Sequence, residues 1–593
     1  MTKIKLTQNA LRVLEARYLQ RDANGCIVET PEQLFESVAR AVAEAERHFG
    51  DAEHVQYWQD RFHKLITSLD FLPNSPTLMN AGKPIGQLSA CFVLPVEDTI
   101  GGIFDAVKQM ALVQRTGGGT GFSFSRLRPK GDLVASTSGE ASGPVSFMKV
   151  FDCATENIKQ GGKRRGANMG VLRVDHPDIL DFVTAKLDGK TLRNFNISVA
   201  VTDDFIKAVE NDSLYELVHP NNPNKRHRVR AAEIFDAITK AAWQTGDPGL
   251  LFIDTINRFN PTPHLGEIEA TNPCGEVPLL PYESCNLGSI NLAHMLHDQN
   301  GKAVIHWSKL RNTVHEAVRF LDDVLEVSKY PICQIRKMTL GNRKIGLGVM
   351  GFAEMLIRLG ISYDSDDAVR TAENIMRFIS KEALYASQQL AEQRGEFPNW
   401  NGSIYENKNI KVRNATRTAI APTGTIGIIA GTSSGIEPLF ALAYRRSHVL
   451  EGQTLIEVNP LFLEYLDRYR LKADEVVEEV LKHGRLKSVQ NAPEPLKQLF
   501  VTALEIPPER NLKIQAALQS SVDNSVSKTI NLPRDSTPQD IARIYLRAWH
   551  MGLKGITVYR YGSKDIQVLE LGTGENIHHF EHASRCDPEE CNI

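Results

Sequence analysis

Cysteine is scarce in this chain, and long apolar runs are absent. Only 8 of 593 residues are cysteine, which excludes a disulfide-rich secreted scaffold and is typical of a reducing cytoplasm. Nowhere do about 18 apolar residues run together, so no membrane span is expected. The N-terminus also lacks the apolar core of a signal peptide. We therefore expect a cytoplasmic protein.

Neither sign of charge is in excess. The chain has 68 Lys and Arg against 71 Asp and Glu, which gives a net charge of −3. A basic face for nucleic acid is therefore not predicted. Internal repeats and low-complexity tracts are also absent, and a hydrophobic content of 42% is ordinary for a globular enzyme.

The pattern along the chain predicts an α/β protein. Residues 1–70 have helical periodicity, and Thr30 to Gln33 offers a helix cap, a proline at the first helical position and a capping-box glutamine. The apolar face of that helix is predicted to comprise Leu34, Phe35, Val38, Ala39, Val42 and Ala43. From Phe71 to about Tyr559, short apolar runs alternate with helical segments, which indicates much parallel strand pairing.

Three glycine-containing runs could contact phosphate. "GLGVMG" (346–351) fits the dinucleotide pattern, but the polar run "MTLGNRKI" precedes it, so close packing between a strand and a helix is the better interpretation. "RTGGGTGF" (115–122) could hold an anion or form a tight turn. "IAPTGTIGIIAGTSSGIEP" (420–438) offers amides and hydroxyls suited to phosphate oxygens.

The cysteines carry the chemical hypothesis. Cys274 lies in "NPCGE" between Asn272 and Glu276, so a thiol is flanked by an amide and a potential base, which suits a substrate with hydroxyl groups. Cys285 follows it closely, and Cys91 lies far upstream in "LSACFVLP". No two of these three cysteines have C-x-x-C spacing, so no metal site is predicted here.

Long motifs make the chain resemble the catalytic chain of ribonucleotide reductases, over residues 10–570. They are "PNSPTLMNAG", "SACFVLPV", "GGGTGFSFSRLRPKG", "ASGPVSFMKVFD", "KQGGKRRGANMG", "NPCGE", "CNLGSINL", "APTGTIGIIAGTSSGIEP" and "GITVYRYGS", in the family's order. The chain looks most like the adenosylcobalamin-dependent class II enzymes. Tyr559 and Tyr561 are separated by Arg560, whereas class I large subunits carry two adjacent tyrosines here. A C-terminal glycyl-radical motif, expected of class III, is also absent.

The resemblance implies a fold and a domain order. We expect a ten-stranded α/β barrel, made of two five-stranded parallel halves that run antiparallel to each other. A helical region (1–70) would precede the barrel (71–561), and a tail (562–593) would follow it. A finger loop at 272–278 would enter the barrel.

The resemblance also implies the chemistry, which is reduction of a ribonucleoside diphosphate to its 2′-deoxy form. Cys274 would be the thiyl radical, formed with adenosylcobalamin, and Glu276 the general base. Asn272 would bind the substrate hydroxyls, while Cys91 and Cys285 would supply reducing equivalents and end as a disulfide. Substrate contacts are expected from Ser75, Ala90, Cys91, Gly119, Asn272, Pro273, Cys274, Gly275, Glu276, Pro422, Thr423, Gly424, Thr425 and Ile426.

Control and re-reduction are implied as well. Loops 159–168 and 186–196 would read a deoxynucleoside triphosphate effector near the interface of a homodimer. The basic residues expected there are Lys159, Lys163, Arg164, Arg165, Lys190 and Arg193. Cys586 and Cys591 in the tail would carry electrons from a thioredoxin- or glutaredoxin-like reductant, with zinc binding beside the tail histidines as the rival interpretation.

Two alternatives stay open at this point. One is a class I large subunit that needs a metal-radical partner, and the other is a nucleotide-binding regulatory homologue without chemistry. The presence of all three cysteines and Glu276 disfavours the second. Residue types do not distinguish diphosphate from triphosphate substrates, and the dimeric, loop-regulated branch of the family favours diphosphate.

Overall fold

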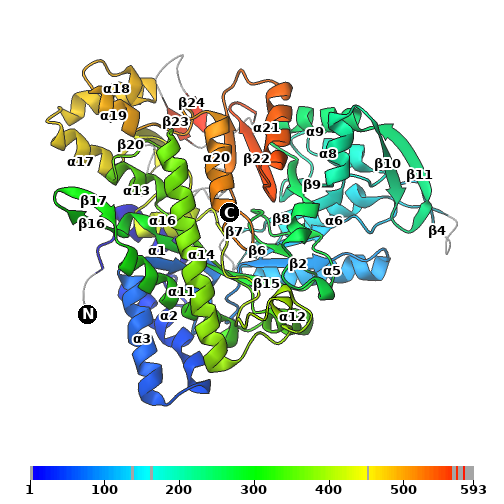
Figure 1. Ribbon diagram of the computed structural model, residues 1–593, viewed down its shortest axis with the longest axis horizontal. Coiled ribbons are helices and arrows are strands. Elements are labelled where there is room, and N and C mark those ends of the chain that lie inside the picture. Colours follow the sequence, from blue (N-terminus) through cyan, green and yellow to red (C-terminus); the bar gives the residue numbers. More distant parts are fainter. Residues whose placement is uncertain are drawn as a thin grey trace.

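Helices form the first part of the molecule. The computed structural model describes residues 4–134, 139–160, 164–449, 453–563, 569–571 and 578–580. Helices α1 (Gln8–Arg17), α2 (Pro31–Ala43) and α3 (Ala52–Thr67) precede the first strand and lie at the lower left of Figure 1. The apolar faces of α2 and α3 pack on α11 (Trp307–Val327), which in turn packs on α14 (Asp366–Arg394), and α1 packs on α16 (Gly424–Ala430).

The start of α2 confirms the sequence prediction. The Thr30 hydroxyl accepts a hydrogen bond from the Gln33 N–H, and the Gln33 side chain accepts one from the Thr30 N–H. Pro31 occupies the first helical position, where its missing N–H costs nothing. All six predicted apolar residues of this helix are buried.

A ten-stranded sheet forms the centre of the molecule. Its strands are β1 (Phe71–Pro73), β2 (Cys91–Pro95), β3 (Gly119–Ser123), β8 (Asn168–Arg173), β9 (Phe195–Val201), β12 (Gly249–Phe252), β15 (Ser284–Asn291), β18 (Ile345–Met350), β21 (Thr529–Leu532) and β22 (Gly555–Arg560). Most are apolar and fully buried, as expected of strands covered on both faces.

The sheet has two parallel halves. In the first, β2, β3, β8, β9 and β12 run parallel. In the second, β15 runs parallel to β18, and β21 to β22. The halves meet antiparallel where β15 pairs β2 and where β12 pairs β22. Bridges from Leu347 to Thr418 and from Ile420 to Val526 close the ring, which confirms the predicted barrel.

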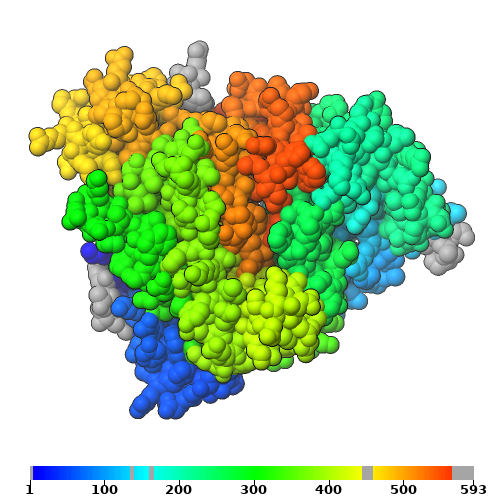
Figure 2. All heavy atoms as spheres, viewed as in Figure 1, coloured from blue at the N-terminus to red at the C-terminus, as the bar shows by residue number. Residues whose placement is uncertain are grey.

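Helices surround the barrel. They are α4 (Ser75–Asn80), α5 (Ile100–Arg115), α6 (Pro144–Glu156), α7 (Ile179–Thr184), α8 (Asp203–Glu210), α9 (Ala231–Thr245), α10 (Ile253–Arg258), α12 (Cys333–Asn342), α13 (Phe352–Arg358), α15 (Ile404–Asn407), α16 (Gly424–Ala430), α20 (Pro508–Gln519) and α21 (Pro538–His550). A separate apolar cluster joins α17 (Pro460–Arg468), α18 (Ala473–His483) and α19 (Glu494–Leu499), the lobe at the upper left of Figure 2.

Short strand pairs complete the fold. They are β4 (Leu133–Val134) with β5 (Gly139–Glu140), β6 (Lys159–Gln160) with β7 (Arg164–Arg165), β10 (Leu214–His219) with β11 (Asn222–Arg230), β13 (Ala270–Thr271) with β14 (Pro278–Leu279), β16 (Leu296–Gln299) with β17 (Lys302–Ile305), and the sheet of β20 (Gln453–Val458), β19 (Ala443–Val449), β23 (Leu569–Leu571) and β24 (His578–Phe580). Among the helices of the described ranges, none combines the length and apolarity that crossing a bilayer requires.

The "GLGVMG" run lies in a barrel strand and not in a nucleotide-binding turn. Gly346 and Gly348 are within β18, and a Cβ at Gly348 would lie 2.3 Å from the Ala419 carbonyl oxygen. These glycines therefore serve close packing, but against the neighbouring barrel segment at Ala419 and not against a helix, as the sequence interpretation had expected. The domain boundaries at residues 70 and 561 stay predictions.

Candidate active site

The "NPCGE" motif forms the tip of a hairpin that enters the barrel. Strands β13 and β14 pair antiparallel and hold residues 272–277 between them. Gly275 has φ of +83°, a conformation that favours glycine, and its N–H donates to the Asn272 carbonyl. The Asn272 side-chain oxygen accepts from the Val277 N–H at 3.0 Å. The loop is thus a closed turn that fixes the residues around Cys274.

Glycines of β3 let the loop come close. A Cβ at Gly121 would lie 1.9 Å from the Thr271 carbonyl oxygen, and one at Gly119 would lie 3.0 Å from the Pro273 ring. The "GGGTGF" run therefore receives the finger loop. The Gly119 N–H donates to the Ala90 carbonyl at 2.8 Å, which brings two predicted substrate residues together.

Cys91 and Cys285 are direct cross-strand partners on two neighbouring barrel strands. They face each other in the antiparallel pairing of β2 and β15. Directly opposed residues in such a pair have Cα atoms about 4.5–5.5 Å apart, within the range that a disulfide spans. Both side chains are buried, and both thiols are free. The predicted redox pair can therefore join without rearrangement of the strands.

Glu276 is a buried carboxyl that faces these thiols. Its Oε1 lies 4.0 Å from the Cys91 Sγ, and its Oε2 is buried with no hydrogen-bond partner among the described residues. Burial raises the pKa of Glu276 to about 7, against a hydrogen bond from Asn272 that lowers it. A carboxyl with such a pKa can take or give a proton near neutral pH.

Cys274 differs from the other two cysteines in exposure. It is exposed at the loop tip, whereas Cys91 and Cys285 are buried. Burial raises the pKa of the Cys91 thiol well above its ordinary value, and negative charge on Glu276, Cys285 or Cys274 raises it further. Burial likewise raises the pKa of Cys285. The two buried sulfurs are thus protonated thiols, and the three cysteines and Glu276 form one electrostatic cluster.

Two other segments of predicted substrate residues each connect a barrel segment to a helix. Ser75 begins α4, and its hydroxyl hydrogen-bonds the Tyr18 hydroxyl at 2.7 Å. The run from Pro422 to Ile426 follows the barrel-closing segment at Ile420 and leads into α16. Thr423 has φ of +53°, and its hydroxyl accepts from the Gly435 N–H at 2.6 Å, which folds the predicted phosphate loop back on itself.

The predicted effector loops lie beside the first half of the barrel. Lys159 and Arg165 are backbone partners in the β6–β7 hairpin, Arg164 lies in β7, and Lys163 lies outside the described residues. In the second loop, Lys190 and Arg193 are exposed. Cys586 and Cys591 lie outside the described residues.

Sequence reasoning missed two residues that hold the finger loop. The Asn196 amide donates to the Pro273 carbonyl at 2.9 Å, and so links the predicted effector loop 186–196 to the active site. The Ser525 N–H donates to the Glu276 carbonyl at 2.8 Å. Asn196 ends a run that the motif search had found, but no local signal marks Ser525, because its contact is made only in the closed barrel.

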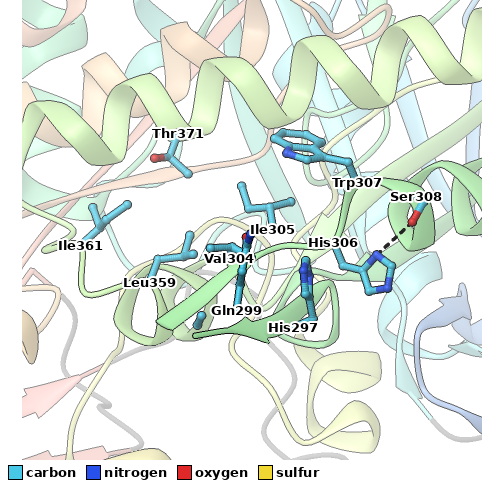
Figure 3. Close-up of a pocket in the computed structure, with 11 residues that line it drawn as sticks. His297, Gln299, Val304, Ile305, His306, Trp307, Ser308, Leu359, Ile361 and Thr371 are labelled. Atoms are coloured by element: carbon cyan, nitrogen blue, oxygen red, sulfur yellow. Dashed lines mark hydrogen bonds between the residues drawn. The ribbon is translucent and has the colours of Figure 1, made fainter. Parts of the chain in front are cut away.

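A pocket of about 640 Å³ lies elsewhere, between the β16–β17 hairpin and α14. Figure 3 shows Thr371 of α14 and Trp307 in the upper part of the view and His297 below them. It contains none of the predicted site residues.

Comparison with known families agrees with this geometry. The all-alpha domain of ribonucleotide reductase matches residues 4–86, and its barrel domain matches residues 89–412 and 408–559. Together these matches span the helices, the barrel strands and the finger loop.

Individual relatives are similar over nearly the whole chain. A vitamin B12-dependent ribonucleoside-diphosphate reductase of Thermoplasma acidophilum is 51% identical, with 96% of this chain and 81% of the relative covered. One of Mycobacterium tuberculosis (strain CDC 1551 / Oshkosh) is also 51% identical, with the same coverage. A vitamin B12-dependent ribonucleotide reductase of Streptomyces clavuligerus is 29% identical, over 96% of this chain and 67% of the relative. The chain belongs to the ribonucleotide reductase family.

Proposed function

We propose that this chain is an adenosylcobalamin-dependent ribonucleoside-diphosphate reductase. The observation that carries the proposal is the pairing of Cys91 with Cys285 opposite a loop that presents Cys274 and Glu276. The names of the relatives at 51% identity support the diphosphate substrate and the cofactor.

Each residue has a task that its environment suits. The Cys274 thiyl takes the 3′-hydrogen atom of the ribose, and Glu276 takes the 3′-hydroxyl proton. The 2′-hydroxyl then leaves as water with a proton from one of the two thiols, Cys91 and Cys285, and the 2′-carbon takes a hydrogen atom from the pair. The two sulfurs join as a disulfide and pass their remaining electron to the sugar, while Glu276 returns the proton to the 3′-oxygen. Cys274 finally returns the hydrogen atom to the 3′-carbon. The unpartnered Oε2 of Glu276 is the acceptor that a substrate hydroxyl would satisfy.

The difference in exposure among the three cysteines is consistent with radical formation by a bound cofactor. When bound, adenosylcobalamin supplies a carbon radical by homolysis of its cobalt–carbon bond. A thiol that meets an external radical source must be reachable, and Cys274 is exposed while the two reducing thiols are buried. Cys274 is therefore the residue that faces the cofactor, and Asn272 and Gly275 hold its loop in place.

Effector binding and dimerisation belong to the same proposal. A deoxynucleoside triphosphate would bind at loops 159–168 and 186–196, and the amide of Asn196 would transmit its presence to Pro273. Helix α5, which packs on α6 and β6, exposes Ile100 and Phe104 by 63% and 52%. That apolar face is the proposed dimer contact, so Phe104→Glu should yield monomers in analytical ultracentrifugation.

Re-reduction completes the cycle. A thioredoxin- or glutaredoxin-like dithiol would reduce Cys586 and Cys591, which would in turn reduce the buried pair. A Cys586→Ser, Cys591→Ser variant should keep its activity with dithiothreitol and lose it with the protein reductant. Full activity with the protein reductant would exclude the shuttle.

The decisive experiment uses the purified chain alone. Deoxynucleoside diphosphate should form when a ribonucleoside diphosphate, dithiothreitol and adenosylcobalamin are present, and none should form without the cofactor. A requirement for a second, metal-containing subunit would overturn the proposal.

A further inference from the structure

A buried ion pair lies beside one of the two reducing cysteines. The Lys344 Nζ is 2.7 Å from the Glu283 Oε2, and each side chain is only 1% exposed. Glu283 also accepts from the Leu280 N–H at 2.6 Å and from the Asn342 amide at 2.5 Å. Burying two charges is costly, and a pair of this kind is weak ground for stability alone. Its position therefore needs a functional explanation.

The strand register places this pair next to Cys285. Asn286 is the parallel partner of Ile345, so the preceding residues, Cys285 and Lys344, are neighbours across β15 and β18. A Cβ at Gly346 would lie 3.6 Å from the Cys285 Sγ, so that sulfur points toward β18. Lys344 is two residues from Gly346 and shares its face. Glu283 likewise shares the face of Cys285.

The two reducing sulfurs consequently have different surroundings. Cys91 faces the finger loop, with its sulfur 4.0 Å from Glu276. Cys285 faces the ion pair. Burial raises the pKa of Cys285, the Lys344 cation opposes that rise, and the carboxylates of Glu276 and Glu283 add to it. The main causes of the pKa shift of Cys91 are burial and the charges of Glu276, Cys285 and Cys274, which raise it, and a hydrogen bond from Asn272, which lowers it. A thiolate is thus better tolerated at Cys285 than at Cys91.

We propose that the Lys344–Glu283 pair sets the direction in which the Cys91–Cys285 disulfide is reduced, with Cys91 as the attacked sulfur and Cys285 as the leaving thiolate. This inference rests on the proposed function, which forms that disulfide in each turnover. Lys344 acts through the charge on Cys285, so it is a positioning residue and not a catalytic one.

The reduction balances with a dithiol as reductant. One thiolate of the dithiol attacks the Cys91 sulfur, the Cys91–Cys285 bond breaks, and Cys285 leaves with the electron pair beside the Lys344 ammonium. The second thiol of the dithiol then attacks the other dithiol sulfur, the one bonded to Cys91 in the mixed disulfide, and releases Cys91. The dithiol is oxidised to its disulfide, and its two protons end on Cys91 and Cys285. Leaving is faster when the leaving thiolate is stabilised.

The first test measures the rate of this reduction directly. The full chain is oxidised with diamide and then treated with dithiothreitol, and the thiols of the Cys91 and Cys285 peptides are counted by alkylation and mass spectrometry. Lys344→Met should slow reduction about tenfold, Lys344→Arg should restore it, and Glu283→Gln should accelerate it about threefold, because the cation then acts unopposed. A purely structural role predicts the same sign for Lys344→Met and Glu283→Gln, and that result would overturn the proposal.

A matched control distinguishes the general effect of removing a buried lysine from the effect of removing the charge near Cys285. Lys528 is also a fully buried lysine, 2.6 Å from the Glu437 carboxylate, but neither residue contributes to the pKa shift of Cys285. Lys528→Met should lose stability and keep the wild-type reduction rate. An equal slowing in Lys528→Met would also count against the proposal.

The second test identifies the attacked sulfur. A monothiol, β-mercaptoethanol, is added to the oxidised chain, and the mixture is quenched with iodoacetamide. The mixed disulfide should be found on Cys91 and the alkylated thiol on Cys285, and the reverse pattern would overturn the assignment.

A single-turnover assay keeps the two proposals apart. The pre-reduced wild-type chain, with adenosylcobalamin, no added reductant and less substrate than protein, should convert that substrate to deoxynucleotide, and Lys344→Met should match it. Failure of the wild type would refute the proposed function. Success of both proteins, with equal reduction rates, would refute the role of Lys344 alone.

Discussion

Two fully buried carboxyl groups in this molecule have pKa values shifted in opposite directions. Glu276 lies in the active site with one oxygen unpartnered, and burial raises its pKa to about 7. Asp322 lies on α11 within a network of arginines. Burial would raise its pKa too, but the cations of Arg343, Arg413 and Arg394 lower it to about 2.

Both carboxyls are buried, and they differ in how many hydrogen-bond and ion-pair partners their oxygens have. Asp322 Oδ1 accepts from the Arg343 Nε at 3.0 Å and from the Asn414 amide at 2.9 Å. Glu276 has room and reactivity left for a ligand, whereas Asp322 joins α11 to α14 through Arg394 at 3.1 Å. Of these two carboxyls, the unsatisfied one lies where the substrate is proposed to bind, and the satisfied one joins two helices that hold the fold.

Removal of the radical-bearing sulfur should have the largest effect. Cys274→Ala should form no detectable deoxynucleotide, because no other exposed thiol occupies the finger loop. Its apparent Tm should stay at the wild-type value, since the lost side chain is exposed. The control is Cys333→Ala, which removes another exposed thiol outside the site and should keep full activity. Turnover by Cys274→Ala within tenfold of wild type would exclude the radical role.

Neutralisation of Glu276 should come next. Glu276→Gln keeps the shape and loses the base, so kcat should fall ~10²- to 10⁴-fold. Glu316→Gln is the matched control, because burial also raises the pKa of Glu316, which lies on α11 outside the site. An unchanged kcat in Glu276→Gln would remove Glu276 from the mechanism.

The same variant should become more stable relative to wild type as the pH rises, because wild type loses stability. The pKa of Glu276 is about 7 in the folded chain and 4.5 as its ordinary value. Its contribution is fully present below about pH 4.5 and is lost as pH rises through 7, a difference on the order of 3 kcal/mol. The apparent Tm of Glu276→Gln relative to wild type should therefore increase between pH 5 and pH 7.5. A gap that stays constant over this range would contradict the raised pKa.

The sequence predicted one side of this comparison better than the other. Asn272, Cys274 and Glu276 are adjacent in the chain, so a motif could identify them together. The partnership of Cys91 with Cys285 came only through family resemblance, because their spacing carries no pairing signal. The barrel was expected on the same ground. The sequence did not predict the roles of Asp322, Lys344 and Ser525. Their partners come from distant segments, and the sequence gives no signal that these polar residues are buried.

Loss of the Asp322 charge should act on the fold and not on catalysis. Asp322→Asn removes the charge that pairs with all three of Arg343, Arg394 and Arg413. Glu326 still pairs with Arg343 and Arg413, and the loss should cost about 3–5 kcal/mol at pH 7. Because the folded pKa is lowered, the wild-type contribution is present above about pH 3.8 and is lost as pH falls through 2. The variant should thus lose its disadvantage in acid, and kcat per folded molecule should match wild type.

Chemical denaturation measures the predicted loss of stability in Asp322→Asn. Titration of the active sites gives the concentration of folded enzyme, from which kcat per folded molecule follows. Asp367→Asn is the matched control, since it removes a carboxylate from an exposed ion pair with Arg370 and should leave the apparent Tm unchanged. A fall in kcat for folded Asp322→Asn would show that the network reaches the active site, and the contrast with Glu276 would fail.

The smallest effect should follow from an exposed polar pair, the third case beside the two buried ones. Thr30→Ala removes the hydroxyl that accepts from the Gln33 N–H at 3.3 Å at the start of α2. Water can replace that bond, so the loss should be about 1 kcal/mol, seen as a small fall in the denaturation midpoint, and Thr30→Ser should recover most of it. Turnover should not change, because Thr30 is exposed and is not one of the predicted site residues. If Thr30→Ala matched the cost of Asp322→Asn, burial would not be what separates these polar groups.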